Sequence, residues 1–193
     1  MLVLSCHSDT GFGVHALDIV DSGRYYGHLD NFACVYGVMK AYFSGRINNN
    51  HTRIELTHGE ETNMEGAREV LRTLHKNDFV IVIDVTATNT SKDIVVEKCK
   101  NPDIRKFIKR SLSGLDFDMY RDCPDPISQS DEVDIYSQEC ARVCFLGLPC
   151  FGGDYNNEKV FCRKQSIDNL AEAICRLSEA FPSFCREHGI PVI

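Results

Sequence analysis

The sequence lacks several features that would assign it to a class at once. Its apolar runs are all much shorter than the roughly 20 residues that a membrane-spanning helix needs. The first seven residues, Met1 to His7, contain no basic region and do not predict a signal peptide. Basic residues are fewer than acidic ones, 21 against 28, which argues against a nucleic-acid partner. We therefore expect a cytoplasmic globular protein that binds neither membranes nor nucleic acid.

Cysteine pairs at metal-binding spacing are also missing. None of the ten cysteines forms a C-x-x-C pair, so neither a zinc knuckle nor a thioredoxin-type site has local support. Most cysteines lie in apolar runs, where they behave as small hydrophobic residues, and a cytoplasm would keep them reduced. The remaining composition is ordinary, with 43% hydrophobic and 25% charged residues in a chain of 193. We expect residues 1–193 to form one domain without a linker.

Apolar runs alternate along the chain with helical patterns. Strands are predicted at residues 2–6, 52–57, 79–85, 93–97 and 142–147. Helices are predicted at residues 31–42, 64–75, 103–112, 132–138 and 166–181. The run at 79–85 is apolar on both faces and should be central, whereas 93–97 should be an edge strand. Asn31 and Ser166 are the predicted N-caps. This alternation predicts an α/β fold, a three-layer α/β/α sandwich with a mixed, mainly parallel central sheet.

Acidic and histidine side chains follow the predicted strands or open a predicted helix. They are His7, Asp9, Asp30, Glu60, Glu61 and Asp84. Ligands of open α/β sheets bind at the carboxyl ends of the strands, so these side chains should converge on one edge. One imidazole among several carboxylates is costly unless a cation neutralises them. Imidazole with carboxylate favours zinc or its neighbours in the periodic table.

Simpler explanations exist for most of these residues taken singly. A His-x-Asp at a strand end is often a hydrogen-bonded turn, and Asp30 is suited to capping a helix. Asp84 is different, because a carboxylate in an apolar central strand should be protonated, paired or bound to a metal. His28 and Asp30 form a competing His-x-Asp. Position favours His7, because it ends a buried strand while Asp30 opens a helix.

Five short motifs occur in an order that resembles the zinc-dependent exopeptidase superfamily, which includes aminopeptidases, carboxypeptidases and amide deacylases with co-catalytic metals. The motifs are His7–Thr10, Gly27–Asn31, Thr57–Glu61, Ile83–Thr86 and Gly147–Asn156. Each motif is short, but the five stand in the family's order over roughly residues 1–180. The set on its expected elements is therefore a fairly specific signal.

The resemblance implies a role for each metal-site residue. His7 would bind the first metal, with Asp9 fixing the imidazole through its other nitrogen. Asp30 would bridge two metals, Asp84 would complete the first metal's ligands, and Glu61 would bind the second metal. The implied cofactor is one or two Zn²⁺ ions, with Co²⁺ or Mn²⁺ as alternatives.

Glu60 is implied to be the general base that deprotonates the attacking water. The resemblance then implies a metal-dependent hydrolase of peptide or amide bonds, similar to aminopeptidases. Its substrates would be short peptides or aminoacyl amides. By analogy with small relatives of this fold, a homo-oligomer is also expected.

The sequence departs from the family's pattern in the late loop, which is predicted at residues 149–157. The family's last ligand is a histidine after an aromatic residue, whereas here Tyr155 is followed by Asn156, a poor zinc ligand. Cys150 and Asp154 are the nearest replacements. A non-catalytic relative with a one-metal or metal-free site, acting as a binding or interaction module, is therefore the alternative function. The interval after Asp84 is too short for an inserted lid domain, so the resemblance implies a lid-less core.

Two further interpretations concern other residues. Asp131 opens an acidic segment that either receives the substrate's amino terminus or is the solvated start of a helix. A cysteine hydrolase would need a thiol beside a histidine and a helix N-terminus. Cys150 and Cys6, which precedes His7, are the candidate nucleophiles.

Overall fold

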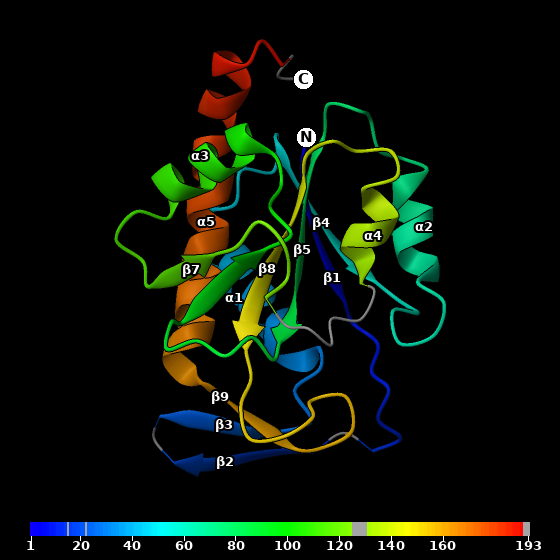
Figure 1. The fold of residues 1–193 in the computed structure, drawn as a ribbon, viewed down its shortest axis with the longest axis vertical. Coiled ribbons are helices and arrows are strands. Elements are labelled where there is room, and N and C mark those ends of the chain that lie inside the picture. The colour runs from blue at the N-terminus through cyan, green and yellow to red at the C-terminus, as the bar shows by residue number, and fades with distance from the viewer. Residues whose placement is uncertain (15, 22, 125–130, 191–193) are drawn as a thin grey trace.

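The computed structural model describes residues 1–14, 16–21, 23–124 and 131–190. Its main feature is a mixed, mostly parallel six-stranded sheet (Figure 1). In spatial order the strands are β4 (Thr52–Thr57), β1 (Leu2–His7), β5 (Phe79–Thr86), β8 (Val143–Pro149), β6 (Ile94–Glu97) and β7 (Phe117–Met119). The first four run parallel to one another, while β6 runs antiparallel to β8. The predicted α/β class is confirmed.

Strand β5 lies inside the sheet between β1 and β8, as its apolar sequence predicts. All eight of its residues are buried, because helices cover both faces of the sheet. All six residues of β1 are buried for the same reason. The polar residues near the carboxyl ends of these strands, His7 and Asp84, are therefore buried as well.

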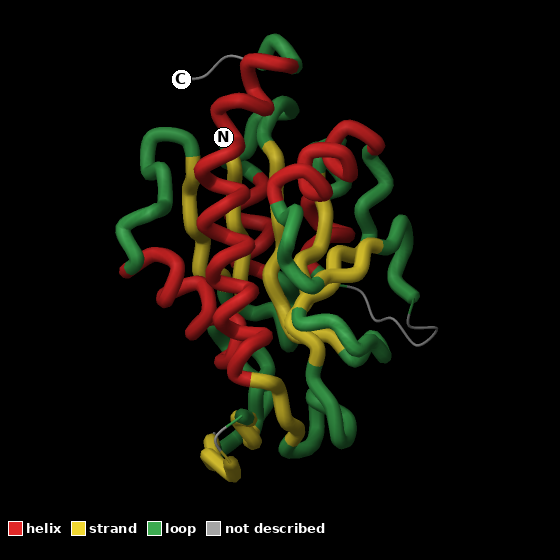
Figure 2. The backbone as a smooth tube through the Cα atoms, turned by 90° about the vertical axis from the view of Figure 1, so that its left-hand side faces the viewer, coloured by secondary structure: helices red, strands yellow, loops and turns green. Residues whose placement is uncertain are grey.

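Helices pack on both faces of the sheet. Those of the described chain are α1 (Phe32–Phe43), α2 (Glu65–Leu71), α3 (Pro102–Ser111), α4 (Glu132–Tyr136) and α5 (Lys164–Glu187). Helices α1, α3 and α5 cover one face and α2 with α4 the other, which gives three layers (Figure 1). Figure 2, turned so that α5 faces the viewer, shows this helix running along the sheet. No helix among the described residues is both long and apolar enough to span a bilayer.

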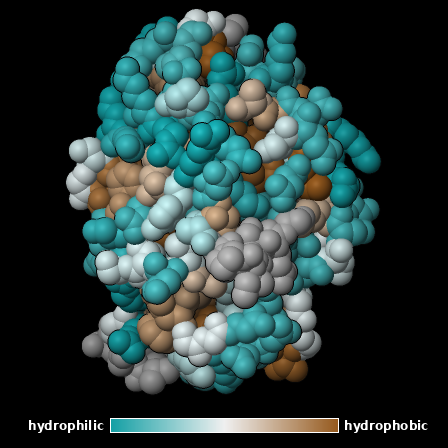
Figure 3. Space-filling view, in the orientation of Figure 1, coloured by the Kyte–Doolittle hydropathy of each residue, from teal (hydrophilic) through white to brown (hydrophobic). Residues whose placement is uncertain are grey.

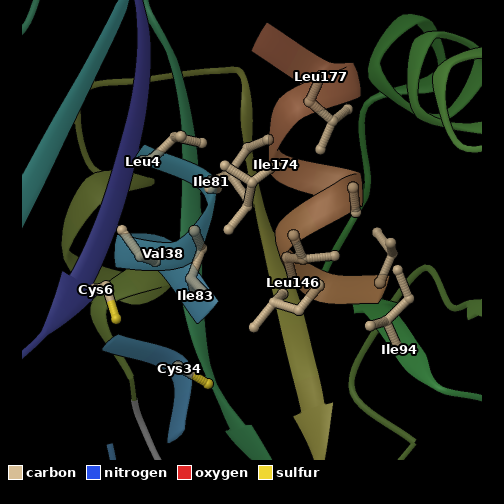
Figure 4. Close-up of a cluster of buried hydrophobic side chains, with 14 of the residues drawn as sticks. Leu4, Cys6, Cys34, Val38, Ile81, Ile83, Ile94, Leu146, Ile174 and Leu177 are labelled. Carbon is tan, nitrogen blue, oxygen red and sulfur yellow. The ribbon is translucent and has the colours of Figure 1, made fainter. Parts of the chain in front are cut away.

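The larger core lies between the sheet and helices α1, α3 and α5. Leu4, Ile81 and Leu146 project from three adjacent strands toward Ile174 and Leu177 of α5 (Figure 4). A smaller core under α2 and α4 is formed by the alternate side chains of β1, β5 and β8. Nine of the ten cysteines are buried, in agreement with their apolar sequence context.

A second, antiparallel sheet was not predicted from the sequence. It consists of β2 (Leu17–Asp21), β3 (Arg24–Gly27) and β9 (Val160–Arg163). It lies beyond the carboxyl ends of the central strands, at the bottom of Figure 1. Its strands are four or five residues long, and their apolar runs of at most three residues are too short to give a clear strand signal.

The predicted edge position of residues 93–97 is wrong. Strand β6 lies between β8 and β7, and all four of its residues are buried. The edge strand on this side of the sheet is β7, whose three residues are half-buried. Strand β6 contains three consecutive apolar residues, as expected of an internal strand, and the very short β7 is typical of a sheet edge.

Asn31 occupies the predicted N-cap position of α1 without a capping hydrogen bond, whereas the prediction of Ser166 as an N-cap is wrong. Helix α5 begins two residues before Ser166, whose hydroxyl donates instead to the carboxylate of Asp93 at 3.0 Å. In both cases the side chain bonds to a strand or loop beside its helix, because tertiary partners are within reach. The helix ends differ as well, since α5 extends to Glu187 and α2 ends at Leu71.

Helix α3 does have a side-chain cap. The Asn101 side-chain oxygen accepts hydrogen bonds from the backbone N–H groups of Asp103 and Ile104, at 2.9 and 3.3 Å. We expect Asn101→Ala to lower the free energy of unfolding by about 1 kcal/mol, because those N–H groups lose their partner. Urea denaturation measures this loss. Asn101→Asp should restore most of the stability, and an equal loss in both variants would contradict the capping role.

Candidate functional site

The acidic and histidine side chains predicted to converge do meet at the carboxyl edge of the sheet. His7 ends β1, Asp84 lies near the end of β5, and Asp30 stands just before α1. One potential ligand atom from each of these residues lies within 4.8 Å of the other two. All three residues are buried, with exposed fractions of 8% or less. Parallel neighbouring strands and the start of α1 create this juxtaposition.

The imidazole of His7 is the centre of the cluster. Its Nε2 atom lies 3.1 Å from Asp30 Oδ1 and 3.3 Å from Asp84 Oδ1. Its Nδ1 atom faces the carboxylate of Asp9, 3.5 Å away. One nitrogen therefore points at the two buried carboxylates, and the other points at a half-buried acid that can orient the ring.

Asn31 holds the start of α1 against the sheet. Its side-chain N–H group donates to the Ile83 carbonyl of β5 at 3.0 Å and approaches the Cys6 sulfur of β1 at 3.5 Å. The peptide bond between Asp30 and Asn31 is cis. The two contacts of the Asn31 side chain place the carboxylate of Asp30 between the ends of the adjacent strands β1 and β5.

Glu60 and Glu61 approach the same histidine from the loop that follows β4. Their carboxylates and His7 form a second group of potential ligand atoms within 4.8 Å of one another. The backbone N–H of Glu60 donates to Asp9 at 3.4 Å, which ties this loop to the one after β1. A Cβ atom at Gly11 would come within 2.9 Å of Glu61 Oε2, so a side chain at that position would require the Glu61 carboxylate to shift.

Negative charge dominates the electrostatics of the cluster. Burial, together with the charges of Asp84 and Asp30, raises the pKa of Glu60 to about 8. Burial and Asp30 likewise raise the pKa of Glu61. Burial alone would lower the pKa of His7, but the neighbouring carboxylates of Asp84 and Asp30 outweigh it and raise that pKa. The carboxylates thus outnumber the one imidazole available to neutralise them.

Unsatisfied buried atoms provide a test of whether these residues fit a cation. His7 Nδ1 and Asp30 Oδ1 are both buried and lack a hydrogen bond of acceptable geometry. Orphaned buried polar atoms are uncommon and call for a missing partner. Imidazole with carboxylate oxygens is a donor set that suits zinc. The residues at this edge therefore fit a divalent cation.

The cluster opens into a cavity of about 800 Å³. Asp30, Glu60, Glu61 and Asp84 line it, as do Asp154 and Asn156 of the late loop. Neither Asp154 nor Cys150 joins a potential metal cluster within the described residues. The carboxylate of Asp154 accepts hydrogen bonds from the backbone of Asn156 and the side chain of Asn157. The late loop thus faces the site without completing a second set of ligands.

Asp131 also lines the cavity, but its carboxylate already has partners. It lies 2.9 Å from Lys98 Nζ and accepts the backbone N–H of Val133, which caps α4. These contacts agree with the interpretation of Asp131 as the start of a helix. The proposed contact between Asp131 and a substrate stays a prediction.

The thiols of Cys6 and Cys150 are poor nucleophiles. Both residues are buried, and burial raises the pKa of each thiol well above its usual value. Nearby carboxylates raise it further, whereas a catalytic cysteine needs an electropositive environment. The geometry does not favour a cysteine hydrolase.

Two buried carboxylates near the site were missed by the sequence analysis. Glu132, on α4, accepts hydrogen bonds from Ser5 of β1 and Thr57 of β4, and so ties together the strands that carry His7 and the Glu60 loop. Glu97, at the end of β6, lines the cavity. The one available signal for Glu97 was its position as a carboxylate at the end of an apolar strand. Because residues 93–97 were predicted to be an edge strand, this signal was not connected with the site.

Comparison with known proteins supports the fold. Neither a protein-family model nor a curated protein sequence matches the chain. An aminopeptidase of the archaeon Desulfurococcus kamchatkensis is similar in structure, with a TM-score of 0.69 and 14% identity over 90% of this chain. The TET1 peptidase of Pyrococcus horikoshii has a TM-score of 0.68 and 12% identity over 85% of this chain. Yeast aminopeptidase 1 has a TM-score of 0.64 and 12% identity over 92%.

The similarity is partial in length. The matched region covers 54%, 52% and 52% of those three proteins in the same order, so this chain spans about half of each. At 12–14% identity the likeness shows a shared fold. The chemistry of the site has to be argued from its own residues.

Proposed function

We propose that the chain is a metal-dependent hydrolase of peptide or amide bonds, similar to aminopeptidases. The observation that carries the proposal is the buried group of His7, Asp30 and Asp84, because Asp30 and Asp84 line the same cavity as Glu60. The fold, which solved aminopeptidases share, supports the same conclusion. We further propose that the domain acts without an inserted lid domain.

The cluster's residues divide between binding the cation and supporting it. His7, Asp30 and Asp84 would hold the first cation, and the donor set favours Zn²⁺ with Co²⁺ or Mn²⁺ as substitutes. Glu61, with Asp30 as a bridge, would hold a second. When bound, the cation lowers the pKa of a water molecule and polarises the substrate's carbonyl group. Asp9 keeps the imidazole of His7 oriented for binding.

Glu60 moves the proton. Its carboxylate accepts a proton from the attacking water as the oxygen–carbon bond forms at the substrate's carbonyl carbon. The same carboxyl group then donates the proton to the leaving nitrogen as the carbon–nitrogen bond breaks. The products are a carboxylic acid and an amine. Partial burial suits this role, because it excludes bulk water while the carboxylate still faces the cavity.

The size of the cavity favours small substrates. Its volume of about 800 Å³ lies within the range of roughly 300–1,000 Å³ that is usual for small-molecule sites. We therefore propose short peptides or aminoacyl amides as substrates. Asp131 on the cavity wall is the proposed contact for their amino terminus.

Self-association is proposed for the same chain. The TET1 peptidase assembles into a tetrahedron or a large octahedral shell. Here α1 exposes Phe32, Tyr36 and Phe43, of which Phe43 is 76% exposed. Figure 3 shows one face of the molecule, on which brown apolar areas interrupt a mostly hydrophilic surface. Phe32 and Tyr36 also line an apolar pocket beside α1, and contiguous exposed apolar patches are typical of contact surfaces.

A second candidate function has its own supporting observation. By the resemblance to the exopeptidase superfamily, Asn156 takes the place of the family's last ligand, and asparagine is a poor zinc ligand. A one-metal or metal-free domain of this kind would act as a binding or interaction module without turnover.

Hydrolysis of leucine p-nitroanilide and of a leucyl dipeptide distinguishes the two functions. We expect turnover by the zinc-loaded protein, its loss after dialysis against a chelator, and its return when zinc is added back. The activation of the attacking water and the polarisation of the substrate's carbonyl group both depend on the cation. Absence of hydrolysis of any aminoacyl amide with excess zinc, cobalt or manganese would favour the binding module.

A further inference from the structure

The cavity beside the metal cluster carries more negative charge than a metal needs. Besides the four acidic residues of the cluster, its wall includes Glu97, Asp131 and Asp154. Among the described residues, no lysine, arginine or histidine lines this cavity. A cation bound at the cluster would neutralise negative charge there, but it would not neutralise the carboxylates of the cavity wall.

The three wall carboxylates differ in their partners. Asp131 is paired with Lys98, and Asp154 is exposed to solvent and bonded within its own loop. Glu97 is 2% exposed, and no ion pair to it occurs within the described residues. The neighbouring Lys98 turns away toward Asp131 and Asp134. A buried carboxylate without a counter-ion is costly, and a ligand cation would remove that cost.

Two threonines fix the Glu97 carboxylate in place. The Thr88 hydroxyl donates to Glu97 Oε1 at 2.6 Å, and the Thr86 hydroxyl lies 3.1 Å from the same oxygen. No hydrogen bond to Oε2 occurs among the residues that the structure describes. One oxygen therefore anchors the side chain, and the other is available to a ligand.

Glu97 stands close to the reacting centre. Thr86 is two residues beyond Asp84 on β5, so their side chains lie on the same face of the strand, about 7 Å apart. Phe145, which is directly opposite Glu97 in the β6–β8 pairing, also lines the cavity. The wall thus combines an apolar ring with a fixed carboxylate. A long side chain with a charged end needs such a combination, because its stem packs on apolar surface.

We propose that Glu97 forms a specificity subsite for a cationic side chain, so that the favoured substrates begin with lysine or arginine. The expected effect on substrate preference in kcat/KM rests on the proposed hydrolase function. The binding of the cationic side chain to Glu97 does not depend on turnover. The Glu97 carboxylate accepts the ammonium or guanidinium group, the hydrocarbon stem packs against Phe145, and the peptide bond lies at the metal cluster.

Lysine and norleucine substrates provide the kinetic test, because both carry an α-amino group and norleucine lacks the side-chain ammonium. We expect zinc-loaded wild-type protein to favour lysine p-nitroanilide over norleucine p-nitroanilide by at least about tenfold in kcat/KM. Glu97→Gln should lower that ratio by about tenfold or more, since the amide keeps the threonine contacts without the charge. The matched control is Glu139→Gln, an exposed position, which should retain the wild-type ratio.

A binding measurement separates failure of the subsite from failure of the hydrolase function. Calorimetry compares lysinamide with norleucinamide on zinc-loaded Glu60→Gln protein, with and without Glu97→Gln. A Glu97-dependent preference for lysinamide supports the subsite even if no variant hydrolyses any substrate. Turnover with no such preference overturns the subsite and leaves the hydrolase proposal intact. An equal loss for both amides on Glu97→Gln assigns Glu97 to the α-amino group and also overturns it. Unaltered circular dichroism and melting temperature confirm that Glu97→Gln is folded.

Discussion

The Glu60→Gln variant is expected to hydrolyse leucine p-nitroanilide about a thousandfold more slowly than the wild type, with no change in metal content. A positioned general base contributes roughly 10²–10⁴ in rate, and a glutamine cannot accept the water's proton. The amide occupies nearly the same volume, so the hydrogen bond from the backbone N–H at position 60 to Asp9 should be kept. Steady-state kinetics and elemental mass spectrometry of the same preparation measure the two effects.

The exposed Glu139→Gln variant is again the matched control and should retain full activity. Parallel loss of metal and activity in Glu60→Gln would identify Glu60 as a ligand, which would contradict its role as the base. That outcome is meaningful here because His7, Glu60 and Glu61 form one of the potential ligand groups.

The second large effect concerns Asp84. Zinc at a hundred times its dissociation constant should stabilise the wild type by about 2.7 kcal/mol, which raises the melting temperature by roughly 5–10 °C for a chain of this length. We expect Asp84→Ala to lose most of this shift. Removal of a ligand should cost more affinity than the 10–100-fold that loss of a supporting residue costs. Thermal unfolding with and without zinc measures the difference.

Asp9→Asn serves as the comparison for Asp84→Ala. Asp9 contacts His7 from the side away from the buried carboxylates, so its replacement should reduce the zinc-induced shift without abolishing it. A full zinc-induced shift in Asp84→Ala would show that the cluster at the sheet edge is not the metal site.

The central part of the fold could be predicted because its signals are local and strong. The run at 79–85 is apolar on both faces, so its burial and its central position follow directly. An aspartate inside that run indicated a functional position, since an unpaired buried carboxylate is costly. The convergence of His7 and Asp84 follows from parallel strands that end at one edge.

The parts that could not be predicted depend on tertiary pairing. Strands β2, β3 and β9 are short and partly polar, so they become strands through their partners and not through their own pattern. The side chains of Asn31 and Ser166 find bonds to residues far away in sequence, which no local capping rule includes. Glu97 was assigned to an exposed edge because nothing in its sequence context shows that β7 lies outside it.

The residues of the late loop have a similar explanation. Asp154 and Asn156 line the cavity as their place after β8 predicts. The hydrogen bonds between Asp154 and its neighbours Asn156 and Asn157 depend on how this loop folds back on itself, which the spacing of the residues does not determine.

The claim on which this account depends is that the sheet edge binds a divalent cation. Metal content per chain, measured by elemental mass spectrometry on protein purified without chelator and re-equilibrated with zinc, tests it most directly. We expect at least one zinc per chain that survives gel filtration. One ion would match His7, Asp30 and Asp84, and two would show that Glu61 and a further residue complete a second site. Protein that retains no metal would contradict the account.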